Sequence, residues 1–493
     1  MEKLANFING SFCQPKSKQY LDVFEPATGE VYSKVPNSST DDITTAFQAA
    51  KDAFPDWSGL PIKSRSQYLN NIADLLESRQ SDFAHYESKD TGKPVSLAET
   101  VDIPRAIANF RFFAEYGTTF KFDSELNSAR SENKVVYAPL GVVGCISPWN
   151  LPLYLFTWKI APAMIAGNTV LAKPSEITPY TAYKLGEICQ DANLPDGVLN
   201  IIHGEGASVG DALINHNGVK AISFTGGTST GKTIAQRTAA SFKKLSLEMG
   251  GKNPAIIFSD CDYDKMLETI VRSSFSNQGQ ICLASSRILI QSNIFDQFKS
   301  DFVQKTSDLI VGDPEDKKSN LGAISYKKHF EKILNYIELA QKEGGNILCG
   351  GEAVNLNGRC KKGWFIEPTI IEGLNNNCKT NQEEIFGPVV SLIPFQNETD
   401  AIQIANESEY GLSATIWTEN KERAARISNQ VEAGVIWVNC WLIRDFRTPF
   451  GGMKQSGIGR EHGLEALEEF REAKHIFIDY DHSNKDWWYG NED

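Results

Sequence analysis

One stretch of the sequence decides the fold, and it begins with GVVGCISPWN at residues 141–150. From there to residue 259, short runs of β-branched and aliphatic residues alternate with glycine or proline turns and with helical segments. Five such runs follow the first: NTVLAKP (168–174), GVLNIIHG (197–204), KAISFTGG (220–227), KKLSLEMGG (243–251) and PAIIFS (254–259). Strands that alternate with helices predict βαβ units and a parallel sheet covered on both faces. Ligands bind such sheets beyond the carboxyl ends of the strands.

A second α/β stretch is predicted downstream of a seam near Gly250 and Gly251. Its strand candidates are SRILIQ (286–291), WFIEPTIIE (364–372), VVSLIPF (389–395), SATIWT (413–418) and VIWVN (435–439). The first 120 residues are predicted to begin with antiparallel strands and to continue as helices. Residues 121–139 and 464–481 are predicted to supply a sheet edge or a subunit contact.

The composition is that of a folded globular protein and argues against several partners. The chain has 493 residues, which suggests two or three domains, and 41 % of them are apolar and 23 % charged. Its 62 acidic residues outnumber its 49 Lys and Arg residues, which gives a formal charge of −13 at pH 7. A binder of phosphate backbones needs the opposite sign, so neither nucleic acid nor an anionic membrane is an expected partner.

The nine cysteines are scattered singly, without a C-x-x-C pair or histidines at zinc-ligand spacing. This pattern is typical of a reducing compartment and predicts no metal site. No apolar signal segment opens the sequence, and the uncharged residues 135–158 are interrupted by Pro139, Pro148 and Pro152. We therefore predict a buried strand and a functional loop there rather than a membrane span, and a cytoplasmic protein.

Two segments place polar side chains just beyond predicted strands. In SPWNLP (147–152), the Asn150 amide can donate a hydrogen bond, as an oxyanion hole requires, although closing a turn is the favoured interpretation of this segment alone. In NTVLAKPSE (168–176), a carboxylate at Glu176 beside Lys173 can bind a ribose hydroxyl and repel a 2′-phosphate. That would favour NAD over NADP, while a surface pair of charges is the simpler alternative.

The segment FTGGTSTGKT (224–233) matches the phosphate-loop pattern G-x-x-x-x-G-K-T between a strand and a helix. Asp260 follows another apolar run, where a nucleoside triphosphatase would hold its magnesium-binding acid. Glycines that open a helix also let backbone N–H groups approach the pyrophosphate of a dinucleotide. The segment by itself leaves both ligands open.

Two further segments carry a candidate nucleophile and a candidate base. FSNQGQICLASSR (275–287) places Cys282 in a loop, and LSLEMGGKNP (245–254) places Glu248 at a strand end. A thiolate is the best side-chain nucleophile at neutral pH, and a carboxylate can activate water against an acyl-enzyme. Most single cysteines are small buried apolar residues, so Cys282 on its own stays an open candidate.

Taken together, seven blocks resemble the aldehyde dehydrogenase superfamily in order and spacing over nearly the whole chain. They are SPWNLP (147–152), AGNTVLAKPSE (166–176), SFTGGTSTGK (223–232), LSLEMGGKNP (245–254), NQGQICLASSR (277–287), EEIFGPVV (383–390) and PFGGMKQSGIGRE (449–461). The resemblance implies an α/β fold with three parts and a homodimer or homotetramer. The parts are a Rossmann-type NAD domain (1–120 and 140–251), an α/β catalytic domain (252–450) and a small oligomerisation region (121–139 and 464–481).

The resemblance also implies NAD-dependent oxidation of an aldehyde to a carboxylic acid. Cys282 would attack the aldehyde, and the Asn150 amide with the Cys282 backbone N–H would bind the oxyanion of the thiohemiacetal. Loss of hydride to NAD would leave a thioester that Glu248 hydrolyses by activating water. The residues implied for NAD binding are Ser147, Trp149, Lys173, Ser175, Glu176, Gly226, Gly227, Gly231, Glu384 and Phe386. The phosphate-loop match would then be an accident of Lys232 and Thr233 following the glycine loop.

The segments NFRFFA (109–114) and VNCWLIRD (438–445) resemble the branch of this family that oxidises muconate semialdehydes. There Arg111 and Arg444 would bind a substrate carboxylate, because a guanidinium matches a carboxylate bidentately. Alternatively, Arg111 lies on a solvated helix face and Arg444 in a surface loop. The implied substrate is 2-aminomuconate 6-semialdehyde of tryptophan (kynurenine) degradation, with 2-hydroxymuconate semialdehyde or a betaine-type aldehyde as alternatives. A phosphate-loop triphosphatase and a catalytically inactive structural protein remain open from other classes.

Overall fold

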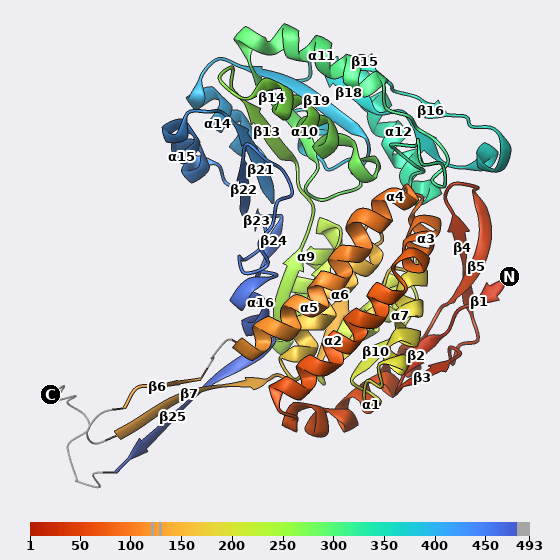
Figure 1. Ribbon diagram of the computed structural model, residues 1–493, viewed down its shortest axis with the longest axis vertical. Coiled ribbons are helices and arrows are strands. Elements are labelled where there is room, and N and C mark those ends of the chain that lie inside the picture. The colour runs from red at the N-terminus through yellow and green to blue at the C-terminus, as the bar shows by residue number, and fades with distance from the viewer. Residues whose placement is uncertain (120–122, 128–130, 481–493) are drawn as a thin grey trace.

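The computed structural model describes residues 1–119, 123–127 and 131–480, and it contains two α/β bodies (Figure 1). The lower body in Figure 1 is built on an eight-stranded sheet and the upper body on a seven-stranded sheet. Gly250 and Gly251 lie between β12 (Lys244–Glu248) of the first sheet and β13 (Asn253–Ile257) of the second. The α/β fold class predicted from the sequence is confirmed.

The eight-stranded sheet has the strand order β24-β12-β11-β8-β9-β10-β2-β3. Strands β12, β11, β8, β9 and β10 are parallel, whereas β24, β2 and β3 pair antiparallel at the edges. Its further bounds are β2 (Asn6–Ile8), β3 (Ser11–Cys13), β8 (Val142–Ile146), β9 (Thr169–Lys173), β10 (Leu199–Ile201), β11 (Val219–Thr225) and β24 (Gly457–Ile458). The carboxyl ends of the five parallel strands therefore meet at one edge, as the β-branched runs predicted.

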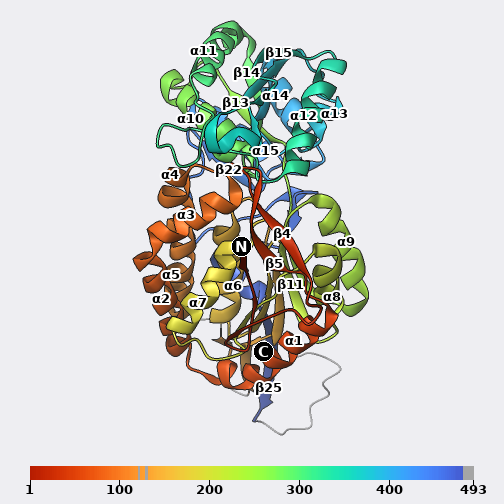
Figure 2. The ribbon, with the colours of Figure 1, turned by 90° about the vertical axis from the view of Figure 1, so that its right-hand side faces the viewer.

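Helices cover both faces of this sheet because its strands are apolar on both sides. Val143 and Cys145 of β8 pack in one cluster, and Val142 and Ile146 pack in another on the opposite face. The first cluster includes α2 (Ile62–Ser78), α5 (Ile103–Thr119), α6 (Pro152–Ile165) and α7 (Tyr180–Asp191), and the second includes α1 (Thr40–Gly59), α8 (Asp211–Asn215) and α9 (Thr228–Thr238). Figure 2 shows α2, α5 and α7 on one side of the lower body and α8 and α9 on the other.

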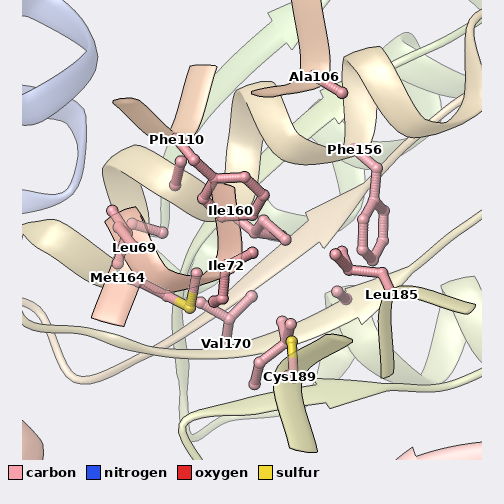
Figure 3. Close-up of a cluster of buried hydrophobic side chains, with 14 of the residues drawn as sticks. Leu69, Ile72, Ala106, Phe110, Phe156, Ile160, Met164, Val170, Leu185 and Cys189 are labelled. Atoms are coloured by element: carbon pink, nitrogen blue, oxygen red, sulfur yellow. The ribbon is translucent and has the colours of Figure 1, made fainter. Parts of the chain in front are cut away.

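Helix α6 is the centre of the first cluster. All 14 of its residues are buried, because α5 covers it on one side and β8 and β9 on the other. In Figure 3, Phe156 and Ile160 of this helix lie among side chains of the sheet and of the neighbouring helices. The uncharged stretch at residues 135–158 is thus a strand, a loop and the start of a buried helix, as the sequence suggested.

The seven-stranded sheet has the order β15-β18-β19-β14-β13-β21-β22, and only β15 pairs antiparallel with its neighbour. The further strands are β14 (Ser285–Gln291), β15 (Asn346–Cys349), β18 (Thr369–Glu372), β19 (Val389–Phe395), β21 (Ser413–Trp417) and β22 (Val435–Val438). The helices of this body include α10 (Tyr263–Phe275), α11 (Phe295–Ser307), α12 (Lys327–Lys342), α13 (Lys379–Gln382), α14 (Glu398–Asn406) and α15 (Lys421–Gln430).

The run WFIEPTIIE, expected as one strand, is divided by Pro368. Its first half forms β17 (Phe365–Ile366), which pairs with β16 (Ala353–Val354) in a separate ribbon, and its second half forms β18. The division follows from Pro368, which has no N–H to donate to a sheet.

Smaller elements join the two bodies. Strand β4 (Tyr20–Glu25) pairs antiparallel with β5 (Glu30–Pro36), which also pairs with β1 (Glu2–Lys3). Helix α3 (Gln80–Thr91), the short α4 (Val95–Leu97) and the π-helical turn η1 (Ala98–Asp102) lead into α5. The short strands β20 (Tyr410–Gly411) and β23 (Met453–Lys454) form another ribbon. Within the described ranges, no helix is long and apolar enough to cross a membrane.

A three-stranded arm extends from the lower body (Figure 1). Strand β7 (Ser131–Pro139) pairs antiparallel with β25 (Arg471–Asp479) on one side and with β6 (Ser124–Glu125) on the other. Helix α16 (Gly463–Glu469) precedes β25 and contacts α6 and β12, so this first part of the segment predicted at 464–481 lies against the body. Residues 121, 122, 128–130 and 481 of the two predicted segments lie outside the described residues.

Candidate active site

Two cavities adjoin between the two bodies, beyond the carboxyl ends of the parallel strands of the first sheet. The larger has a volume of about 540 Å³ and the smaller about 190 Å³. Cys282 lines both cavities, together with Thr225 and Met249. One sulfur atom therefore lies where a molecule in either cavity can approach it.

The loop before Cys282 is held in a strained backbone conformation. Asn277, Gln278 and Gly279 have successive φ angles of 53°, 57° and 68°, in the left-handed region that non-glycine residues rarely adopt. A Cβ on Gly279 would lie 2.1 Å from the Gly387 carbonyl oxygen, so only glycine fits there. The Gln278 amide donates to the Ala323 carbonyl oxygen at 2.9 Å and fixes the turn. Strain of this kind persists where the surrounding structure imposes it, most often at functional sites.

The Asn150 side chain is buried beside this loop. Its Nδ2 donates to the Gln280 carbonyl oxygen at 2.9 Å. The backbone carbonyl oxygen of Asn150 accepts from Asn277 Nδ2 at 3.2 Å. An amide nitrogen carries two hydrogens, and only one of them is used by Gln280. Because Asn150 and Cys282 both line the smaller cavity, the second hydrogen is available to an oxygen bound there. This geometry supports the predicted oxyanion role.

Glu248 and Cys282 both line the larger cavity, and burial raises the pKa of both groups. Burial raises the pKa of the Cys282 thiol to about 12, against the opposing effect of the Arg444 guanidinium. Burial also raises the pKa of the Glu248 carboxyl well above its ordinary value, and the Glu461 carboxylate raises it further. A buried carboxyl that is easily protonated and deprotonated near a nucleophile is suited to act as a general base.

A buried polar cluster lies behind Glu248. Lys159 Nζ of α6 contacts Glu461 Oε1 at 2.8 Å, and the hydroxyls of Ser223 and Ser246 donate to the same oxygen at 3.0 and 3.1 Å. These contacts link α6, β11 and β12 to Glu461, which follows β24 in the sequence. The Lys159 ammonium partly offsets the effect of Glu461 on the Glu248 carboxyl, so the cluster sets how readily Glu248 loses its proton.

Five of the ten residues predicted to bind the cofactor line the smaller cavity. Trp149, Gly226, Gly227, Glu384 and Phe386 line it. The Trp149 and Phe386 rings meet edge to face, with centroids 5.3 Å apart. The Gly251 N–H donates to Glu384 Oε1 at 2.9 Å, and a Cβ on Gly250 would lie 2.1 Å from the Glu384 carboxylate. These two glycines therefore let the carboxylate approach the backbone closely.

Lys173 and Glu176 lie at the end of β9, as predicted, and form an ion pair with Nζ and Oε2 3.0 Å apart. Burial raises the pKa of Glu176, but the Lys173 ammonium and hydrogen bonds from the Glu176 and Gly206 backbone together outweigh it, so the net pKa lies below the ordinary value. Ser147 and Ser175 are buried at the ends of β8 and β9. Gly231 lies on α9, where a Cβ would meet the Met249 sulfur at 2.7 Å. Lys173, Glu176, Ser147 and Ser175 thus lie at or just beyond the same strand edge, and Gly231 lies in the first turn of the helix that follows β11.

Three guanidinium groups line the larger cavity without a carboxylate partner in the described part of the chain: the half-buried Arg444 and Arg105, and the exposed Arg272 of α10. Arg444 donates from Nη1 to the Tyr154 hydroxyl at 2.6 Å, and its Cζ lies 5.1 Å from the centre of the Trp158 ring and 4.7 Å from that of Phe450. Its Nε is buried and has no hydrogen-bond partner among the described residues. Arg105 of α5 is half-buried, and its Cζ lies 5.7 Å from the centre of the Phe446 ring. The buried Arg444 Nε without a partner, together with the nearby positive charge of Arg105, favours an anionic ligand.

Arg111 does not reach the cavity, so its predicted role in substrate binding is wrong. Its guanidinium lies on the outer face of α5 and bonds Asp74 at 2.8 Å and Glu77 at 2.5 Å, both on α2. The step of six residues from Arg105 to Arg111 turns the helix by about 600°, which places their side chains about 120° apart. Of the other two arginines that line the cavity, Arg105 is half-buried and Arg272 is exposed, so Arg105 is the stronger candidate to act with Arg444.

The comparisons with known proteins agree with this site. A model of the Aldehyde dehydrogenase family matches residues 12–476. The chain belongs to the aldehyde dehydrogenase family. It is 48 % identical to the human 2-aminomuconic semialdehyde dehydrogenase, over 96 % of this chain and 98 % of that protein. It is 42 % identical to the 2-hydroxymuconic semialdehyde dehydrogenase of Pseudomonas sp. strain CF600, over 97 % and 100 %. The NAD⁺ complex of a Bacillus cereus aldehyde dehydrogenase superposes with a TM-score of 0.94 at 34 % identity, covering 97 % of each chain.

The phosphate-loop interpretation fails in this aldehyde dehydrogenase. Lys232 is exposed on α9, whereas a phosphate-loop lysine would turn back over the glycines. Asp260 follows a strand of the other sheet, where its carboxylate bonds the Thr418 hydroxyl and the Arg423 guanidinium, both at 2.8 Å. It cannot hold a magnesium ion beside the loop after β11. Within the residues that the structure describes, no group of three His, Cys, Asp or Glu could hold a metal ion.

Several residues of the aldehyde dehydrogenase site escaped the sequence analysis. Arg105, Lys159 and Glu461 are charged residues in otherwise apolar or glycine-rich segments, which was the available signal for burial. The aromatic residues around Arg444 carried no such signal, because their role depends on segments that are far apart in the sequence. These aromatic residues are Tyr154, Trp158 and Phe450.

Alkylation of Cys282 by iodoacetamide is expected to accelerate about tenfold per pH unit from pH 7 to 9. The reason is that the thiolate fraction of a group with a pKa of about 12 grows in that proportion. Peptide mass spectrometry measures the rate for each cysteine separately. Cys189, whose burial in the helix core raises its pKa to about 12 as well, is the matched control and should stay unmodified. A rate at Cys282 that levels off below pH 8 would contradict this geometry.

Proposed function

We propose that this enzyme oxidises a semialdehyde that carries a carboxylate, with NAD as the electron acceptor, and that its substrate is 2-aminomuconate 6-semialdehyde. The observation that carries the proposal is the set of guanidinium groups in the cavity that Cys282 lines, of which Arg105 and Arg444 are half-buried and Arg272 is exposed. A carboxylate bound between Arg105 and Arg444 places the aldehyde at the other end of a short substrate near the sulfur. The name of the human relative at 48 % identity supports the choice of substrate.

The chain's own residues supply the steps of the reaction. The Cys282 sulfur attacks the aldehyde carbon, and its proton passes to water and is released to solvent before the hydrolysis step. The Asn150 amide and the Cys282 backbone N–H then hold the oxygen of the thiohemiacetal. The hydrogen on that carbon leaves as a hydride and the carbon becomes a thioester. Glu248 takes a proton from water, the water oxygen attacks the thioester, and the acid leaves as the sulfur recovers its proton.

The smaller cavity fits a nicotinamide dinucleotide. When bound there, NAD accepts the hydride that the substrate carbon releases. Glu176 would bind the adenosine ribose with Lys173, and Gly226 and Gly227 would flank the pyrophosphate. The Gly226 N–H donates to the Glu248 carbonyl oxygen at 3.0 Å, so the Gly227 N–H is the donor left for the pyrophosphate. No atom lies within 4 Å of where a Cβ on Gly227 would stand, so space for a ligand is open beside that backbone. Glu384 and Phe386 would hold the nicotinamide ribose and ring.

The two alternative substrates differ in how they suit the cavity. A betaine-type aldehyde carries a quaternary ammonium, which two guanidinium groups repel. 2-Hydroxymuconate semialdehyde carries the same carboxylate and differs from the aminomuconate substrate at one substituent, so the arginines favour neither. The higher identity to the aminomuconate enzyme than to the hydroxymuconate enzyme supports the former.

We also propose that the enzyme works in the cytoplasm as a homodimer or homotetramer assembled through the arm. Strand β25 is the edge of the arm sheet, and its Ile476, Phe477 and Ile478 side chains are exposed. An exposed sheet edge with apolar side chains is suited to bind another chain.

Substitution of either cavity arginine should weaken use of a carboxylate substrate selectively. Arg105→Met and Arg444→Met are each expected to lower kcat/KM for adipate semialdehyde roughly 30- to 1,000-fold. This corresponds to about 2–4 kcal/mol, because the charge pair between the guanidinium and the substrate carboxylate is lost. The rate with hexanal, which has the same chain length and no carboxylate, should change much less. Steady-state NADH absorbance measures both rates.

Arg111→Met is the matched control for that experiment. Its guanidinium is 40 % exposed and pairs only with Asp74 and Glu77 on the outside of the protein. Its kinetics with both aldehydes should equal those of the wild type. Equal losses with adipate semialdehyde and hexanal in the Arg105 and Arg444 variants would contradict the proposed substrate class.

Glu176→Ser should shift the cofactor preference from NAD toward NADP. The carboxylate that repels a 2′-phosphate is then absent, and Lys173 is released to attract one. The ratio of kcat/KM for NAD to that for NADP should fall by about tenfold or more, since removal of one repelling charge is worth more than about 1.4 kcal/mol. Glu187→Gln on α7, where Glu187 pairs with Lys184, is the control. An unchanged ratio in Glu176→Ser would remove Glu176 from the ribose site.

A further inference from the structure

Three charged side chains are buried together beneath the Asn150 loop. Lys93 follows the left-handed Gly92 that ends α3, Glu87 lies on α3, and Asp102 ends the π-helical turn η1. Their side chains are 0 %, 0 % and 2 % exposed. Lys93 Nζ forms a short contact with Asp102 Oδ2 and lies 3.8 Å from Glu87 Oε1. The cluster therefore holds one ammonium and two carboxyl groups away from water.

The contribution of such a cluster to the stability of the folded protein does not by itself explain its presence. Desolvation of buried charges offsets most of their attraction, and apolar side chains of similar volume often stabilise a protein as well or better. Burial raises the pKa of the Glu87 carboxyl to about 7, against the effect of the Lys93 ammonium, which shows how unfavourable this environment is for charge. A buried lysine in this position is thus better explained by what its remaining donors contact.

The remaining contact of Lys93 is the backbone of Asn150. Lys93 Nζ donates to the Asn150 carbonyl oxygen at 3.1 Å, and that oxygen also accepts from Asn277 Nδ2 at 3.2 Å. The side-chain Nδ2 of Asn150 donates to the Gln280 carbonyl oxygen at 2.9 Å. Asn150 is therefore held at its backbone and at its amide, and two of the three contacts come from the strained loop that carries Cys282.

The two contacts at the carbonyl oxygen fix the peptide plane of a residue in irregular backbone. Asn150 lies in a bend, and the next residue is the N-terminal cap of α6, so no secondary structure orients its carbonyl group. If Lys93 were absent, only the neutral amide of Asn277 would hold that group. A hydrogen bond from an ammonium is roughly twice as strong as one from a neutral donor.

We propose that Lys93 is a positioning residue for Asn150: its ammonium, itself anchored by Asp102, holds the Asn150 peptide so that the free amide hydrogen points at the oxygen of the Cys282 adduct. The inference rests on the proposed oxyanion role of Asn150. Lys93 lines neither cavity, although its partner Asp102 lines the larger one, and the proposal assigns the effect of Lys93 on turnover to Asn150.

Lys93→Met tests this role, with two reactions of Cys282 measured side by side. Turnover of adipate semialdehyde should fall about 10- to 100-fold in kcat, the range expected when one oxyanion donor is displaced rather than removed. The KM for NAD should stay within twofold. Alkylation of Cys282 by iodoacetamide displaces iodide and forms no oxyanion, so its rate and pH dependence should be those of the wild type. Lys89→Met, four residues earlier on α3 and exposed over the Tyr32 ring, is the matched control and should change neither reaction.

A second comparison uses the background of Asn150→Ala. Since Lys93 acts through Asn150, adding Lys93→Met to Asn150→Ala should lower kcat by less than about threefold more. Multiplication of the two separate losses would overturn the proposal, as would equal slowing of turnover and alkylation in Lys93→Met. If Asn150→Ala alone leaves kcat unchanged, the oxyanion role of Asn150 fails instead, and the two failures are distinguished.

Lys93→Met leaves two buried carboxyl groups without their cation, so its folding has to be separated from its catalysis. The variant Lys93→Met/Asp102→Asn/Glu87→Gln removes the three charges together and should unfold at a temperature closer to that of the wild type. It lacks the same ammonium, and it should show the same loss of turnover with normal alkylation. Wild-type turnover in this variant would show that the ammonium has no positioning role.

Discussion

The backbone turn at residues 277–279 determines where the chemistry of this protein can take place. Three successive left-handed residues are unfavourable, and the turn exists because its side chains bond fixed backbone groups of both bodies. As a result, Cys282 lies at the junction of two cavities. A cysteine in a relaxed strand or helix would face one side only, whereas this one is accessible to a substrate and to a cofactor that enter from different directions.

Burial is the second determinant, and it acts on each charged group of the site differently. It raises the pKa of the Cys282 thiol and of the Glu248 carboxyl, because their charged forms lose hydration there. The guanidinium groups at the other end of the cavity carry a permanent positive charge. The cavity therefore combines a thiol and a carboxyl of raised pKa with a fixed positive end. That combination suits an aldehyde whose far end is an anion.

Much of the fold was predictable from local sequence. The apolar runs after residue 141 gave the parallel strands, because strands buried on both faces need β-branched and aliphatic residues throughout. Cys282, Glu248, Asn150 and Lys173 could be selected as well, since each stands at a strand end or in a glycine-rich loop. The division of the run at Pro368 shows the limit of this approach: the run is continuous in hydrophobicity but interrupted in hydrogen bonding.

The substrate arginines show why the rest could not be predicted. Arg111 and Arg105 lie on one helix, and the sequence does not reveal which face of α5 turns toward Cys282, a residue of the other body. The contacts of Lys93 with Asn150 and of Glu461 with Lys159 could not be predicted either, because the paired residues are 57 and 302 positions apart in the sequence. Only the tertiary structure shows that these charges are buried.

The central claim is that Cys282 forms a covalent thioester with the substrate, and mass spectrometry of Glu248→Gln tests it most directly. This variant, mixed with NAD and adipate semialdehyde and stopped in acid, should gain the mass of the aldehyde less two hydrogen atoms. Peptide mapping should place that mass on Cys282, because the base that hydrolyses the thioester is absent. An unmodified Cys282 while NADH is still formed, or an adduct on another residue, would contradict the account.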